Sequence, residues 1–231
     1  MAITTENRTT FYTVAFVSQL LALGIVVQAA YFFVTYWGAP LDWATKNGVT
    51  SYHPLLLVIA FVWCQGEAIV TYRIYRYMPK IFLKWAHAVL HAIAIALAFT
   101  GFSAMELHIV RREGHHFDNP HSWLGIILLF TYACQFIIGF ISFLFPGLPG
   151  HVRSWFMPTH KFMGLILFVF TMAQIIGGLH AFGEPQCKGW CTARWLSCFL
   201  QPMLLCYSIT VVYLLVTPEY KRDPLPTDPT H

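Results

Sequence analysis

The sequence predicts an all-α integral membrane protein with six transmembrane helices, on three observations. Of the 231 residues, 57% are hydrophobic and 10% are charged, whereas soluble domains carry roughly 25% charged residues. Six stretches reach the length of about 20 mostly apolar residues that crosses a bilayer. Polar and turn-forming residues separate these stretches. The expected spans are Val14–Trp37, Pro54–Tyr72, Leu83–Leu107, Ser122–Phe145, Phe162–Phe182 and Trp195–Val216.

The placement of Lys and Arg beside the spans predicts their orientation. With a cytosolic N-terminus, that side holds nine Lys and Arg residues and the other side holds five. Cytosolic loops are the ones enriched in these residues. We therefore expect one multi-pass transmembrane domain over residues 1–231, with 1–12 and 217–231 as cytosolic tails. The chain has no run of like charges, so its charge pattern does not indicate a nucleic-acid partner.

Four of the eleven histidines stand near the ends of expected spans. His53, His87, His121 and His160 open the second to fifth spans and are 34, 34 and 39 residues apart. Because consecutive spans run in opposite directions, His53 and His121 should share the non-cytosolic level. His87 and His160 should share the cytosolic level. An ionisable group inside a membrane indicates a functional site.

These pairs point to haem as the cofactor. Imidazole is a usual axial ligand of haem iron, and two facing helices can clamp the ring between them. Zinc is the rival, but zinc takes three or four ligands that converge on one point. The two pairs instead lie at opposite faces. Since the chain has no Cys-x-x-Cys-His motif, we expect two non-covalent haems b.

Small and polar residues inside the spans form two weaker patterns. Glu67, Gln135 and Gln174 each lie 14 residues after one of the four histidines, with Gly101 at that place in the third span. Fourteen residues are almost four helical turns, so the spacing either marks the inner face of a bundle or is chance. For Glu67 we expect a neutral state or a partner such as Arg73, with proton handling as the alternative. Glycines that would let a flat macrocycle approach are Gly66, Gly101, Gly125, Gly139, Gly164, Gly177 and Gly178.

The histidine motifs resemble those of the eukaryotic cytochrome b561 family, over about Phe11 to Arg222. The resemblance implies a six-helix bundle with two haems b in its four central helices. His53 and His121 would bind the non-cytosolic haem, and His87 and His160 the cytosolic haem. Family members carry electrons from cytosolic ascorbate to monodehydroascorbate or ferric iron, and they often form homodimers. The matching segments are His53–Leu55, Trp85–His91, Pro120–Gly125 and Arg153–His160.

The resemblance also implies binding residues at both faces of the membrane. At the cytosolic face, four cations would hold haem propionates and ascorbate, since Arg and Lys bind carboxylates; alternatively they only follow the positive-inside rule. Lys221 and Arg222 resemble a tail pair that reaches the same surface. At the other face, His108 matches a histidine near the acceptor site, and Asn119 is expected to bind the cofactor. The four cations are Arg73, Lys80, Lys84 and Arg153.

The sequence departs from the family pattern on the non-cytosolic side. Asp118-Asn119-Pro120 precedes the His-Ser-Trp motif, His180 and Ala181 stand where an acid is usual, and the loop Pro185–Cys191 does not match. The electron acceptor, monodehydroascorbate or a ferric chelate, therefore stays open. So does a disulfide between the two cysteines of that loop, Cys187 and Cys191, on the oxidising side.

Two other classes of function remain as alternatives. A metal transporter is suggested by His115, His116 and Asp118 in one loop, which could capture a cation, although exposed loop histidines are usually inert. A haem-bearing membrane anchor of a respiratory-type dehydrogenase would need a quinone site and a partner subunit.

We expect the plasma membrane or an endosomal or secretory vesicle membrane as the location.

Overall fold

The protein is a bundle of long helices. The computed structural model describes residues 5–36, 41–182 and 191–225. Within these ranges, six helical stretches are long and apolar enough to cross a membrane. The predicted six-helix, all-α membrane fold is confirmed. The candidate spans are Arg8–Thr35, Val49–Ile74, Lys80–Arg112, Pro120–Phe143, Gly150–His180 and Thr192–Val216.

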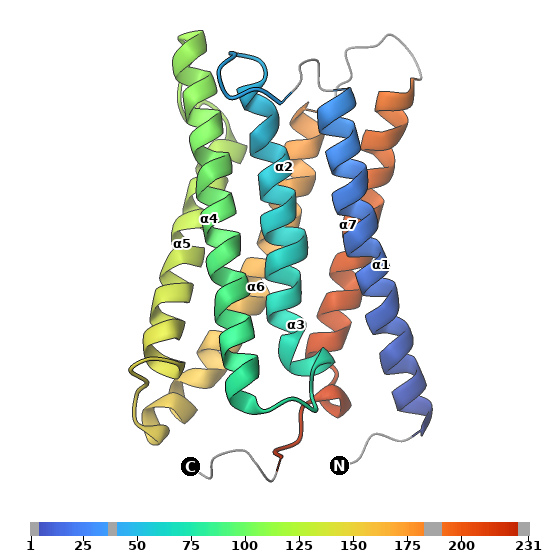
Figure 1. The fold of residues 1–231 in the computed structure, drawn as a ribbon, viewed down its shortest axis with the longest axis vertical. Coiled ribbons are helices and arrows are strands. Elements are labelled where there is room, and N and C mark those ends of the chain that lie inside the picture. Colours follow the sequence, from blue (N-terminus) through green and yellow to red (C-terminus); the bar gives the residue numbers. More distant parts are fainter. Residues whose placement is uncertain (1–4, 37–40, 183–190, 226–231) are drawn as a thin grey trace.

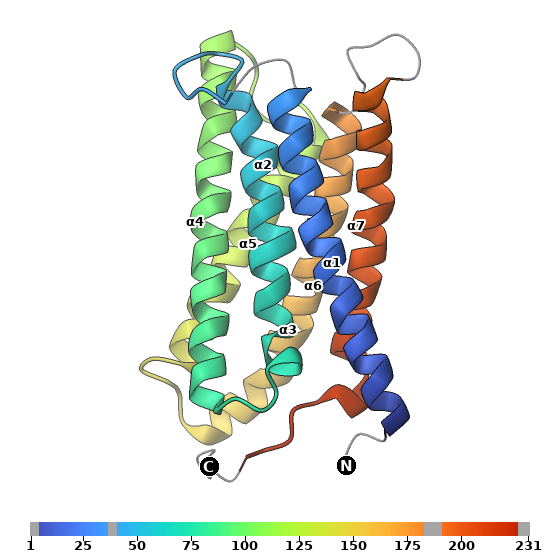
Figure 2. The same cartoon turned by 45° about the vertical axis from the view of Figure 1, so that its right-hand side comes forward.

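The helices are antiparallel neighbours in an up-and-down arrangement (Figure 1). The start of α1 and the end of α7 lie at the same end of the bundle, and α4 and α7 lie on opposite flanks in both views (Figures 1 and 2). Helix α1 packs on α7, α2 and α3 pack on α4, and α5 packs on α6. The helices are α1 (Thr5–Thr35), α2 (Tyr52–Val58), α3 (Gly66–Ile74), α4 (Lys80–Arg112), α5 (Pro120–Phe143), α6 (Gly150–Phe182) and α7 (Thr192–Val216).

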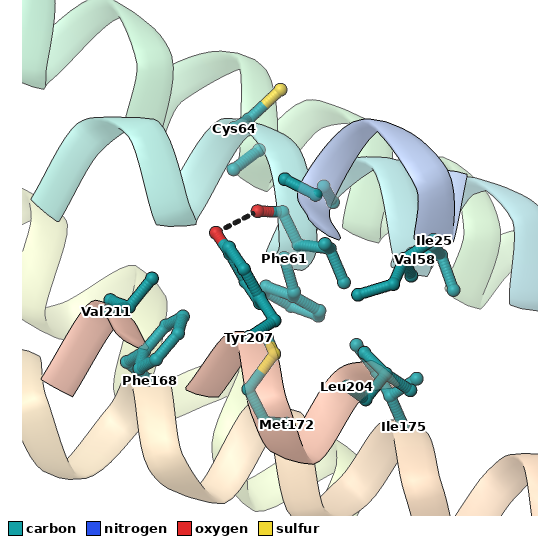
Figure 3. Packing of buried hydrophobic residues seen from close by; sticks show 14 of the residues in the cluster. Ile25, Val58, Phe61, Cys64, Phe168, Met172, Ile175, Leu204, Tyr207 and Val211 are labelled. Carbon is teal, nitrogen blue, oxygen red and sulfur yellow. Dashed lines mark hydrogen bonds between the residues drawn. The ribbon is translucent and has the colours of Figure 1, made fainter. Parts of the chain in front are cut away.

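The second span contains a π-helical stretch, η2 (Ile59–Gln65), between α2 and α3. A π turn holds one more residue than an α turn and leaves backbone groups less well paired. The hydroxyl of Tyr207 on α7 donates to the Val62 carbonyl oxygen at 2.7 Å. A Cβ on Gly66 would collide with this hydroxyl, so glycine leaves the room that Tyr207 needs. Figure 3 shows the Tyr207 hydrogen bond within the packed side chains.

Apolar side chains from four spans close the interior around Tyr207 (Figure 3). The ring of Phe168 packs against that of Tyr207, with ring centres 6.0 Å apart. These side chains are buried, and they pack α1 and α7 against the second and fifth spans. The cluster includes Ile25, Val58, Phe61, Met172, Ile175, Leu204 and Val211.

The fifth span begins earlier than the sequence predicts. The expected start was Phe162, whereas α6 begins at Gly150 and holds Pro158 in its interior. His160 is therefore the eleventh residue of its helix and does not open it. The residue before a proline usually marks a helix boundary, and polar residues lower the hydropathy here. The helix nevertheless continues, with one backbone hydrogen bond fewer.

Candidate functional site

The four predicted histidines come together as two pairs. The ring centres of His53 and His121 are 6.4 Å apart, with an angle of 78° between the ring planes. Those of His87 and His160 are 6.3 Å apart, with an angle of 66°. The structure thus brings together the two pairs that alternating helix direction predicts.

Both separations fit one iron between two imidazoles. A bond from a metal to an imidazole nitrogen is about 2 Å long, so two imidazoles on opposite sides of one ion have ring centres about 6 Å apart. Within the described ranges, no group of three or more His, Cys, Asp or Glu side chains could hold a metal ion. The donor set therefore suits a bis-histidine haem and not tetrahedral zinc. His115, His116 and Asp118 are described residues and form no such group, so the possible cation capture that suggested a metal transporter finds no support here.

One imidazole of each pair contacts a backbone carbonyl. His53 Nδ1 lies 3.1 Å from the Gly101 oxygen, and His87 Nδ1 lies 2.7 Å from the Ala68 oxygen. An Nδ1–H that donates to a carbonyl fixes the tautomer and leaves Nε2 free to bind a metal. These two side chains are therefore held as metal-ligating histidines usually are.

The other imidazole of each pair contacts a glutamine. Gln174 Nε2 lies 3.0 Å from His121 Nδ1 and donates to the His121 carbonyl oxygen at 2.5 Å. Gln135 Nε2 lies 3.0 Å from His160 Nδ1 and donates to the His160 carbonyl oxygen at 2.8 Å. For these glutamines the 14-residue spacing does mark the inner face of the bundle.

The glycines on this face make room for side chains of the neighbouring helix. A Cβ on Gly139 would lie 2.8 Å from His160 Cε1, and one on Gly178 would lie 2.8 Å from His121 Cε1. Gly177, which was expected to serve a macrocycle, differs: no described atom lies within 4 Å of its Cβ position. Gly139 and Gly178 thus cradle the two imidazoles that the glutamines contact.

Helices α5 and α6 carry the same pattern of residues, His-x3-Gly-x9-Gln-x3-Gly. Because the helices are antiparallel, the first half of one pattern meets the second half of the other. The first glycine faces the opposite glutamine, and the second faces the opposite imidazole. This internal repeat is readable in the sequence and could have identified the glutamines and glycines. Its members are His121, Gly125, Gln135 and Gly139 in α5, and His160, Gly164, Gln174 and Gly178 in α6.

The second span obeys the same spacing with one residue added. Gly101, which contacts His53, lies 14 residues after His87. Ala68, which contacts His87, lies 15 residues after His53. The π turn supplies the extra residue. The backbone carbonyl beside His87 therefore belongs to Ala68, one residue after Glu67.

Glu67 instead faces the outer helix α1. Its Oε1 accepts a hydrogen bond from Gln19 Nε2 at 2.5 Å. Glu67 therefore has a partner, as one of the expected alternatives held, but it is Gln19. Arg73, the partner suggested from the sequence, donates to the Thr217 and Leu215 carbonyl oxygens at 3.1 and 2.5 Å. Those carbonyls end α7, where the helix dipole favours a cation.

His91, one turn deeper than His87, extends the pair of His87 and His160 toward the middle of the bundle. Its ring centre is 4.4 Å from that of His87, and its Nδ1 is 2.5 Å from the Tyr132 hydroxyl. Tyr132 is 3% exposed and contacts Phe61, with ring centres 5.6 Å apart. The spacing of four residues between His87 and His91 was the sequence signal for this contact.

Cations gather at the end of the bundle that the charge count predicts to be cytosolic. Lys84 donates to the Phe143 carbonyl oxygen at the end of α5, at 2.8 Å. The charges of Arg153 and Lys80 act on Lys84. Three of the four predicted anion-binding cations therefore lie together, while Arg73 lies beside the end of α7.

The segment after α7 runs beneath the bundle (Figure 2). Arg76 donates to the Lys221 carbonyl oxygen, and Arg222 Nη2 donates to the Met78 carbonyl oxygen at 3.1 Å. Tyr220 is 2% exposed, its ring packs 5.0 Å from that of Phe11, and burial raises its pKa to about 12. The expected return of the Lys-Arg tail to this surface is seen in these contacts.

At the opposite end, the predicted residues make structural contacts. His108 Nδ1 lies 2.7 Å from the Lys46 carbonyl oxygen. Asn119 caps α5, because its side-chain oxygen accepts from the Ser122 backbone N–H at 3.0 Å. His116 pairs with Glu106 at 2.8 Å.

The connection before α7 contains the cysteines whose pairing the sequence left open. Cys191 is disulfide-bonded. Cys187, Glu184 and the rest of the loop 183–190 lie outside the described residues. Among the residues that the structure describes, the free cysteines are Cys64, Cys134, Cys198 and Cys206.

Comparison with known proteins assigns the family. The model of the eukaryotic cytochrome b561 family matches residues 52–183. The proteins named transmembrane ascorbate-dependent reductase CYB561 of Mus musculus and Homo sapiens are each 31% identical to this chain, cover 91% of it, and are themselves covered over 85% and 84% of their lengths. The probable ascorbate-specific transmembrane electron transporter 2 of Oryza sativa subsp. japonica is 29% identical, over 90% of this chain and 91% of that protein. With its six spans and two histidine pairs, this chain belongs to the eukaryotic cytochrome b561 family of membrane haem proteins.

Proposed function

We propose that the protein moves electrons across its membrane from cytosolic ascorbate through two haems b. One haem lies between His87 and His160, and the other between His53 and His121. The observation that carries this proposal is the separation of the ring centres, 6.3 and 6.4 Å, which suits one iron in each pair. When bound, haem iron accepts and releases one electron at a time.

Two centres suit the thickness of the membrane. Gln135 stands beside His160 and follows His121 by 14 residues on the same helix. At 1.5 Å per residue, the level of His121 and the level of His160 are about 21 Å apart along the bundle. The apolar core of a bilayer is about 30 Å thick. Two centres divide this distance into steps, with the buried pair His91 and Tyr132 on the inner side of the cytosolic one.

The cations at one end support ascorbate as the donor. Ascorbate is an anion at neutral pH, and a cluster of positive charges raises its local concentration and its rate of encounter. Lys80, Lys84 and Arg153 form such a cluster, and the tail brings Arg222 toward the same end. Arg73 stands beside the end of α7, within reach of the same surface. Two animal relatives are named ascorbate-dependent reductases.

The acceptor on the other face is monodehydroascorbate or a ferric chelate. His108 and Asn119 stand at that end and would orient the acceptor or the adjoining haem. The protein would act as a homodimer in the plasma membrane or a vesicle membrane, with both termini in the cytosol. Stopped-flow reoxidation of the ascorbate-reduced protein by each acceptor distinguishes the two, because the physiological one should react faster.

Haem content is the direct test. The purified protein should contain two haems b per chain and should be reduced by ascorbate. His87→Ala should remove one haem and leave the other, and His53→Ala should remove the other one. A folded preparation with one haem or none refutes the proposal. Co-purification of a flavin or iron–sulfur subunit would favour the membrane-anchor alternative.

A further inference from the structure

We infer that Gln135 and Gln174 are positioning residues that act crosswise on the two haem sites. Gln135 sets the orientation and basicity of His160 at the cytosolic site. Gln174 does the same for His121 at the other site. This inference rests on the proposed function, because it takes the four histidines as haem ligands.

Each glutamine makes two contacts with one histidine on the neighbouring helix. Its Nε2 lies 3.0 Å from Nδ1 of the ring and 2.8 or 2.5 Å from the carbonyl oxygen of the same histidine. The same amide nitrogen is within hydrogen-bonding distance of both atoms, so the glutamine stands beside the ring and beside the backbone of one histidine. A side chain that only filled space would need neither.

Glycines stand beside each ring and each glutamine, at positions where a larger side chain would collide with them. A Cβ on Gly139 would meet His160 Cε1, and a Cβ on Gly125 would lie 3.2 Å from Gln174 Nε2. The second glycine of α6, Gly178, closes the space beside His121 in the same way. The glutamine and the imidazole therefore fit closely against the neighbouring helix, and their positions are sterically restricted.

The chemistry of a metal-bound histidine gives the glutamine its effect. With a metal on Nε2, the ring carries its proton on Nδ1, and an acceptor at Nδ1 raises the basicity of the ligand. A half-turn of the glutamine amide exchanges its oxygen and nitrogen, so in the metal-bound state the oxygen can accept from this proton. The hydrogen bond from Nε2 to the histidine carbonyl oxygen is then given up, because an amide oxygen cannot donate to a carbonyl. A more basic ligand favours the oxidised iron and lowers the reduction potential.

The glutamines are also the replaceable half of each site. His53 and His87 contact backbone carbonyls, which no substitution removes. His121 and His160 contact side chains. A change at Gln135 in α5 should therefore alter the reduction potential of the haem bound by His160 in α6. A change at Gln174 in α6 should alter the potential of the haem bound by His121 in α5.

The test compares Gln135→Leu and Gln174→Leu in the full-length, haem-loaded protein by optical redox titration and by electron paramagnetic resonance of the ferric state. Gln135→Leu should raise the potential of the cytosolic haem and change its resonance signal, leaving the other haem unchanged. Gln174→Leu should give the reverse pattern. Gln28→Leu is the matched control, since Gln28 is a glutamine of the first span that donates to the Leu196 carbonyl at 2.7 Å, between α1 and α7, which carry none of the four histidines. It should change neither haem.

A second variant covers the case in which the leucine change releases a haem. Gln135→Glu keeps an oxygen acceptor at the same length, so it should bind both haems with the cytosolic potential at or below its original value. Loss of only the cytosolic haem in Gln135→Leu, with retention in Gln135→Glu, also supports the inference. Equal shifts of both haems, no shift in either leucine variant, or a raised potential in Gln135→Glu would overturn it. A wild-type protein that binds fewer than two haems would instead overturn the proposed function.

Discussion

The glycines beside the imidazoles permit a sharp test of the two proposed haem sites. A methyl group added at Gly139 would lie 2.8 Å from His160 Cε1, whereas carbon atoms in contact are about 3.5–4.0 Å apart. The ring would therefore have to move by roughly 1 Å. A metal–ligand distance tolerates only about 0.2 Å. Gly139→Ala should therefore lose the cytosolic haem, with an overpacking cost of about 1–3 kcal/mol.

The equivalent glycine beside His121, Gly178, provides the parallel experiment, and its neighbour Gly177 provides the control. Gly178→Ala places a methyl group 2.8 Å from His121 Cε1, so it should lose the non-cytosolic haem. Gly177→Ala, one residue away, meets no described atom within 4 Å. It should keep both haems and gain up to about 1 kcal/mol of helix stability.

Haem per chain, measured by pyridine haemochrome against protein concentration, reads out the three variants. Redox titration then identifies which haem remains. The reasoning is refuted if Gly139→Ala retains two haems with unchanged potentials. It is also refuted if Gly177→Ala loses haem as Gly178→Ala does, because the loss would then not depend on contact with the imidazole.

Three further variants test other contacts. Tyr207→Phe removes the donor to the Val62 carbonyl in the π turn and should cost about 1–3 kcal/mol of stability in thermal unfolding; an unchanged midpoint would show that the turn does not need this bond. Asn119→Ala removes the cap of α5 and should cost about 1 kcal/mol with both haem spectra unchanged, and a spectral change would instead favour its predicted cofactor role. Glu67→Gln should leave both haem potentials unchanged in redox titration, because the carboxyl group faces Gln19; a shift would place Glu67 at the haem site.

The spans and the histidine pairs were predictable because both follow from distance along a helix. A bilayer demands long apolar stretches, and these stretches fix where each helix lies. Alternating direction then places His53 with His121 and His87 with His160. The start of α6 was missed because Pro158 and nearby polar residues resemble a helix boundary, although the helix continues through them.

The partners of the imidazoles were less predictable, because they depend on how each helix is rotated about its axis. In a membrane the helices are apolar on nearly every side, so hydropathy does not identify the inner face. The repeated pattern in α5 and α6 contains that information for Gln135 and Gln174. For Glu67 the regular spacing misleads, since the π turn adds one residue and turns the carboxyl group to α1.

The sequence by itself determined depth: which residues cross the membrane, and at which level each histidine stands. Depth follows from the fixed rise per residue of a helix and the thickness of the bilayer. Tertiary structure alone decided rotation and neighbours, including the carbonyls of Gly101 and Ala68 beside two of the histidines. The physical reason is that rotation is set by close packing between helices, where glycines and the Tyr207 hydroxyl decide which faces can meet.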